Sequence, residues 1–196
     1  AALIQMRQND GSSTPDVPYT TAPGIGVYQP TPGVAAPRFE GWQYVRPFGI
    51  NSASQFRADW NAVMDVRSDS YTRDYNEVKS VGDALVRGNA PNSEQSDIAR
   101  FWPGGGYDFH AIARTIATGK AMDSWERARL FALVDMGQAD TLIGVFDTKY
   151  VYRFWRPVTA IRWANDGNPG TPSDAAWTPF LATPPYPDYT CGLPNG

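Results

Sequence analysis

Apolar side chains recur every three or four residues along several stretches of the chain, and this spacing is typical of α-helices that bury one face. Residues 70–86 follow the pattern, and Asp69 or Ser70 can cap the helix that they predict. A further helix is predicted to follow Ser93 and to run to Trp102. The same pattern predicts shorter helices at residues 1–7, 52–62 and 108–118.

The longest predicted helix begins at Asp123 or Ser124 and continues into the segment at Lys149. Its start resembles a capping sequence, in which the Asp123 side chain accepts from free backbone N–H groups and Glu126 bonds back to the cap. Apolar residues then continue at helical spacing for about seven turns. This helix is long enough to organise the packing of the others.

Segments rich in proline and glycine lie on both sides of the predicted helices and indicate long ordered loops. Residues 11–51 contain seven prolines, so we expect an extended wrap there with little regular structure. Residues 52–162 should form the helical core, and residues 163–196 a rigid loop. The predicted fold class is all-α, in a single domain over residues 1–196.

Composition excludes several classes of function. The chain has 196 residues, of which 42% are hydrophobic, and a formal net charge of −3, so it offers no basic stripe for a nucleic-acid backbone. No apolar run approaches the roughly 20 residues of a membrane span. The single cysteine, Cys191, cannot form an internal disulfide, and with the single histidine, His110, it cannot build a zinc site.

Two cations end the longest predicted helix in an aromatic setting, in the sequence Lys149-Tyr-Val-Tyr-Arg-Phe-Trp-Arg156-Pro157. Seven residues are two helical turns, so Lys149 and Arg156 fall on nearly the same face if the helix persists. Pro157 biases Arg156 out of the helical region, so we expect the helix to stop there. An ammonium and a guanidinium together suit a phosphate-shaped anion, whereas the simpler interpretation is that both cations favour the helix end.

Other candidate sites carry less chemistry. Residues 104–106 are three glycines, but no lysine and hydroxyl residue follow at the spacing of a phosphate-binding loop. His110 is expected to be a neutral imidazole bonded to a loop carbonyl. Asp140 and Asp147 share a helix face, but without Glu-x-x-His partners a di-iron site is weakly supported. We expect these aspartates to orient arginines such as Arg153 or Arg162, or to cap loops.

The Lys-x6-Arg-Pro segment resembles the first signature of the vanadium-dependent haloperoxidases, which share a fold and an anion site with type 2 phosphatidic acid phosphatases. Segments 74–79, 95–102 and 183–189 are also similar to the bacterial haloperoxidase-like branch, in the same order. The resemblance covers nearly the whole chain. It implies an all-α helical bundle of the haloperoxidase and acid phosphatase type, and a vanadate cofactor, with phosphate as its analogue.

The resemblance also implies roles for particular residues. Lys149 and Arg156 would hold the vanadate, and Cys191, Gly192 and Leu193 stand where the family has a Ser-Gly-His triplet. Gly192 keeps the backbone N–H, whereas cysteine is a poorer donor than serine and leucine transfers no proton. The halide-pocket aromatics would be Phe146 and Tyr186, for which core packing is the alternative. No vanadium-ligating histidine belongs to these motifs.

The function implied is halide oxidation by hydrogen peroxide at bound vanadate. Two alternatives stay open: phosphate-ester hydrolysis on the same anion site, and a non-catalytic subunit that binds a ligand or serves in assembly. The resemblance further implies an interior portion of a longer protein, with helices before it and the larger catalytic part after it or on a second polypeptide. It favours a secreted or periplasmic location.

Overall fold

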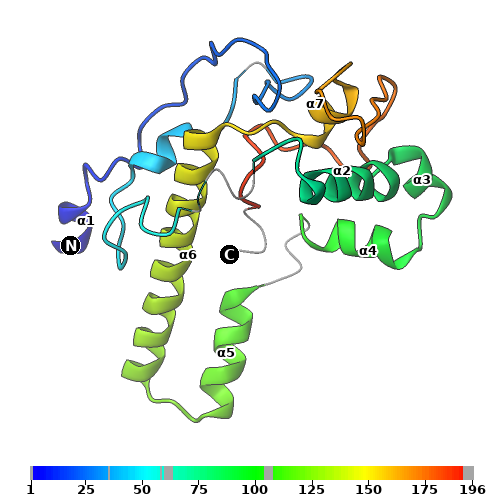
Figure 1. Ribbon diagram of the computed structural model, residues 1–196. Coiled ribbons are helices and arrows are strands. Elements are labelled where there is room, and N and C mark those ends of the chain that lie inside the picture. Colours follow the sequence, from blue (N-terminus) through cyan, green and yellow to red (C-terminus); the bar gives the residue numbers. More distant parts are fainter. Residues whose placement is uncertain (1, 35, 58, 60–63, 104–107, 192–196) are drawn as a thin grey trace.

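The computed structural model describes residues 2–34, 36–57, 59, 64–103 and 108–191. These residues form helices joined by long loops, with isolated bridges but no strands among them. Figure 1 shows the longest helix, α6, beside α5 in a hairpin that extends away from the other helices. The elements are α1 (Ala2–Met6), η1 (Glu40–Tyr44), α2 (Asp69–Val81), α3 (Ala84–Asn89), α4 (Glu94–Phe101), α5 (Phe109–Gly119), α6 (Ser124–Tyr152) and α7 (Pro157–Arg162). The all-α prediction is therefore confirmed.

Helix α6 begins as the sequence predicts. The Asp123 side chain accepts from the Trp125 and Glu126 backbone N–H groups, and the Glu126 side chain accepts from the Asp123 N–H, which completes a capping box. The helix then runs for 29 residues. η1 packs against it, and α5 packs beside it. None of the helices in the described ranges is both long and apolar enough to cross a membrane.

The helix predicted at residues 70–86 is two helices. Its N-cap is Ser68, whose hydroxyl accepts from the Tyr71 N–H, and not Asp69 or Ser70. α2 ends at Val81 and Gly82 follows it as the C-cap. Asp83 then caps α3 by accepting from two backbone N–H groups. A side chain that competes this strongly for backbone donors ends one helix and starts another, which periodicity alone does not reveal.

The short helix predicted at residues 52–62 is wrong for the part that the structure describes. Residues 53–56 form a turn, in which the Gln55 N–H donates to the Ser52 carbonyl at 3.1 Å. The Gln55 side chain also accepts from the Asn51 N–H at 2.6 Å. Residues 58 and 60–63 lie outside the described residues.

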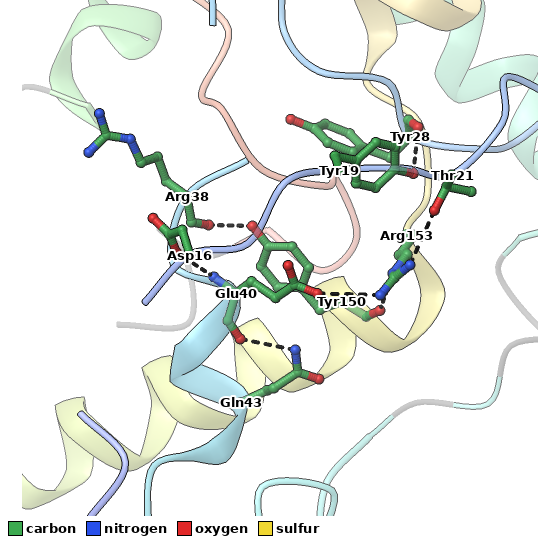
Figure 2. A network of polar contacts seen from close by, with 9 residues as sticks. All are labelled: Asp16, Tyr19, Thr21, Tyr28, Arg38, Glu40, Gln43, Tyr150 and Arg153. Carbon is green, nitrogen blue, oxygen red and sulfur yellow. Dashed lines mark hydrogen bonds and ion pairs between the residues drawn. The ribbon is translucent and has the colours of Figure 1, made fainter. Parts of the chain in front are cut away.

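The wrap at residues 11–51 has little regular structure besides η1, as predicted. Polar contacts bind it to the end of α6, as Figure 2 shows. Arg153 forms an ion pair with Glu40 of η1 at 3.3 Å and donates to the Thr21 hydroxyl at 3.2 Å. The Tyr150 hydroxyl donates to the Arg38 carbonyl. The wrap is therefore part of the packed structure and not a linker.

The main hydrophobic core lies where α2 meets α7. Trp155 is its largest buried side chain, with a relative exposure of 1%. Trp177, from the loop after α7, packs into the same cluster and donates its indole N–H to the Lys79 carbonyl of α2 at 2.9 Å. This core fixes the segment that connects α6 to α7.

Candidate functional site: two buried cations on one loop

The helix does not persist from Lys149 to Arg156, so these two residues do not share one helical face as predicted. α6 ends at Tyr152, and Arg153 adopts left-handed backbone angles, with φ of 49°. The next two residues are extended and pair with the wrap, where the Trp155 N–H donates to the Gly26 carbonyl at 3.0 Å. Arg156 is the N-cap of α7, with Pro157 in its first position.

The structure nevertheless brings both cations to one loop segment, residues 186–188. The Lys149 ammonium is 1% exposed and donates to the Pro187 carbonyl at 3.0 Å and to the Asp188 carbonyl. Burial, aided by the nearby charge of Arg156, lowers the pKa of Lys149 to about 8. Two of the three ammonium protons are thus engaged, and the third is left for another acceptor.

Arg156 approaches the same segment from the other side. Its Nε–H donates to the Tyr186 carbonyl at 2.6 Å, and Nη1 forms an ion pair with Asp188 at 2.9 Å. The remaining nitrogen, Nη2, is buried and has no hydrogen-bond partner among the residues that the structure describes. A buried guanidinium nitrogen without an acceptor is costly, so it calls for an explanation. An anion at this position would supply the missing acceptor.

The ring of Tyr186, one of the two predicted pocket aromatics, lies near both cations. Its ring centroid is 5.2 Å from Lys149 Nζ and 4.8 Å from Arg156 Cζ. Phe146 of α6 meets this ring edge-on at 5.4 Å between centroids. Burial raises the pKa of the Tyr186 hydroxyl, which keeps it protonated. Phe146 and Tyr186 therefore line one aromatic wall beside the cations.

Sequence reasoning missed two residues of this arrangement. Phe39 adds a third ring, with its centroid 5.3 Å from that of Phe146, and its φ of 65° is in the left-handed region. Bulky residues rarely adopt that conformation, and Phe39 is 45% exposed although its ring contacts those of Phe146 and Tyr186. Asp188 is the carboxylate partner of Arg156, and only its place in the similar segment 183–189 could have suggested it.

Of the other two predicted site residues, the structure describes only Cys191. Cys191 is exposed and lies on the wall of the cavity that also includes Asp188. Gly192 falls outside the described residues, as does Leu193. The predicted backbone N–H at Gly192 stays a prediction.

The helix aspartates stabilise loops and bind an arginine that was not predicted. Asp140 accepts from the backbone N–H groups of residues 48–50, so it caps a loop. Asp147 binds Arg57 through both carboxylate oxygens at 2.7 Å, and not Arg153 or Arg162. Both carboxylates are thus engaged with protein donors. No group of three potential metal-ligating side chains occurs among the described residues.

His110 is not bonded to a loop carbonyl, which corrects that prediction. Its Nε2 lies 2.6 Å from an Asp135 carboxylate oxygen of α6, so the pair joins α5 to α6. Both side chains are substantially exposed. The three glycines at 104–106 lie outside the described residues.

Comparisons with known proteins point to one family. Residues 129–193 match the family model of the VCPO second helical-bundle domain, a range that contains Lys149, Arg156 and Tyr186. The chain is also similar to a solved structure described as the first bacterial vanadium-dependent iodoperoxidase, at 28% identity and a TM-score of 0.70. Both findings support a vanadium haloperoxidase-like family for this chain. No curated protein matches it.

The match to the vanadium iodoperoxidase covers 96% of this chain and 46% of the other. This haloperoxidase-like chain therefore spans less than half the length of the protein it matches. The residues present fit a tetrahedral oxyanion, because Arg156 Nη2 and one Lys149 proton lack acceptors within the described ranges of the chain.

Proposed function

We propose that the chain contributes the cationic half of a vanadate site and takes part in halide oxidation by hydrogen peroxide. The observation that carries the proposal is the buried Arg156 Nη2, which has no partner in the described part of the chain, while the other two guanidinium nitrogens of that residue donate. Iodide is the halide to test first, because the similar solved structure is described as an iodoperoxidase. When bound, vanadate would supply the activation of peroxide.

The chain's own residues supply charge and orientation. Lys149 and Arg156 carry two positive charges, and Asp188 offsets one of them, which leaves a net positive site for an anion. Since both cations are buried and held by residues 186–188, they need little reorganisation when the anion binds. Preorganised charges of this kind act strongly because the surroundings have a low dielectric constant. The rings of Phe146 and Tyr186 would exclude water on one side.

Vanadium NMR and iodide oxidation, measured on the same protein preparation, test the proposal. Lys149→Ala and Arg156→Ala should each weaken vanadate binding by at least about tenfold, since each removes a charged donor. Iodide oxidation should fall with the bound vanadate. Arg100→Ala, which removes an exposed arginine elsewhere, is the matched control and should change neither. Unchanged vanadate binding in both alanine variants would refute the proposal.

Phosphate-ester hydrolysis is the second candidate, because the same donors can bind any tetrahedral oxyanion. The sign of the vanadate effect separates the two. Vanadate should activate a peroxidase, whereas it should inhibit hydrolysis of para-nitrophenyl phosphate by competing for the site. Vanadate binding without either activity would instead favour a subunit that only binds the anion.

A further inference from the structure

A cavity of about 530 Å³ lies between α2 and α7, a volume suited to a small organic molecule. Its walls are largely apolar and aromatic, and include Met64, Val78, Trp155 and Ile161. Asp188, the partner of Arg156, also lines it. The cavity is therefore next to the cations but is built mainly by other residues.

Two polar atoms in this cavity wall have no hydrogen-bond partner among the residues described by the structure. They are the indole Nε1 of Trp155, on a side chain that is 1% exposed, and the hydroxyl of Tyr71. Both side chains line the cavity, and neither polar atom is within hydrogen-bond distance of a partner among the described residues. Burial raises the pKa of the Tyr71 hydroxyl, so it stays a donor. The indole N–H can only donate, so both atoms can serve one acceptor.

The neighbouring tyrosine shows that such a hydroxyl can be satisfied here. Tyr75 lies one turn further along α2 and lines the same cavity. Its hydroxyl donates to the Pro172 carbonyl at 3.0 Å. The missing partner of Tyr71 is therefore specific to its position, and is not a general property of this wall.

We propose that the cavity binds an uncharged aromatic compound that presents one oxygen acceptor to Tyr71 and Trp155. The aromatic ring would pack on the apolar wall, which removes apolar surface from water. An anionic ligand is disfavoured, because the carboxylates of Asp74 and Asp188 line the same cavity. This site takes no vanadate, so its occupancy does not depend on the proposed peroxidase activity.

Fluorine NMR with para-fluoroacetophenone tests the site in the absence of vanadate and peroxide. The matched probe is para-fluorocumene, which has nearly the same shape but no oxygen. The ketone should bind about tenfold more tightly, since only it can accept the two hydrogen bonds. Equal binding of the two probes, or no binding of the ketone, would overturn the proposal.

Two tyrosine variants assign the preference to one hydroxyl. Tyr71→Phe removes a hydroxyl that has no partner, so the fold should keep its stability while the preference for the ketone falls severalfold. Tyr75→Phe removes a bonded hydroxyl, so it should lower the melting temperature and keep the preference. A preference for the ketone that survives in Tyr71→Phe would contradict the assignment. A failure of vanadate to bind at Lys149 and Arg156 would not contradict it.

Discussion

Arg156 donates its Nη1–H to the Asp188 carboxylate at 2.9 Å, while Nη2 is buried without a partner among the described residues. The carboxylate therefore has two opposing effects. It stabilises the folded chain by neutralising a buried guanidinium, and it weakens the attraction of the site for an incoming anion. Replacement of Asp188 separates these effects.

Asp188→Asn should lower the free energy of unfolding by about 2 kcal/mol, because it leaves the Arg156 charge buried without a counter-ion. The same variant should bind vanadate more tightly than the wild type, since the net local charge rises. Chemical denaturation with and without vanadate measures both. Asp74→Asn, in an exposed ion pair, is the control. Weaker vanadate binding in Asp188→Asn would show that the carboxylate positions Arg156 for the anion.

Lys149 should give the site a pH dependence that is opposite for binding and for stability. Its pKa is about 8 in the folded chain, below its ordinary value of 10.5, because burial disfavours the charge. Between these two values the unfolded chain binds more protons, so the contribution of Lys149 to the free energy of unfolding rises with pH. Anion affinity falls over the same window as the ammonium deprotonates.

Molybdate is the probe for this prediction, because it remains a dianion above neutral pH. Its affinity, measured by calorimetry, should fall up to about tenfold per pH unit above about 8. Lys149→Arg keeps its charge throughout, so its molybdate affinity should change little. A wild-type affinity that stays constant to pH 10 or so would contradict the assignment to Lys149.

Asp140 of α6 holds the loop at residues 48–50 by accepting from three backbone N–H groups, at 2.6 to 3.0 Å. Asp140→Asn replaces one accepting oxygen by an amide that repels these donors. The free energy of unfolding should fall by about 3 kcal/mol, as measured by urea denaturation. Asp135→Asn changes an exposed carboxylate on the same helix and should cost less than about 1 kcal/mol.

The pair formed by Arg57 and Asp147 depends on the shape of the guanidinium as well as on its charge. Both contacts are 2.7 Å, and the Asp147 side chain is 9% exposed. Arg57→Lys keeps the charge but loses one of the two bonds, so the free energy of unfolding should fall by about 1 kcal/mol. Arg73→Lys, in an exposed pair, should leave the melting temperature unchanged. Equal effects of the two variants would argue against a bidentate contribution.

Local sequence patterns predicted the helices well and their interruptions poorly. The capping box at Asp123 and the apolar spacing of α6 are properties of neighbouring residues, so they can be read from the sequence. The break after Val81 depends on the hydrogen bonds that the Asp83 side chain accepts from two backbone N–H groups. The end of α6 at Arg153 requires a left-handed backbone conformation, and no glycine is present there to indicate it. These two helix ends depend on which distant parts of the chain pack against them.

The site shows the same division. Lys149, Arg156 and Tyr186 were predicted together, yet the geometric reason for the pair, a shared helical face, was wrong. They meet because residues 186–188 return to the junction of α6 and α7. Phe39 joins them from more than 100 residues away in the sequence, and no local pattern encodes that contact.

The junction between α6 and α7 is clamped by the wrap, where the Tyr28 N–H donates to the Arg153 carbonyl at 2.7 Å and the Trp155 N–H donates to Gly26. Both bonds involve residues that lie between Lys149 and Arg156 in the sequence. The spacing of the two cations is therefore set by a segment that contributes no side chain to the anion. Redesign of oxyanion selectivity could begin there, by changing the length of the wrap near Gly26 while every ligand stays in place.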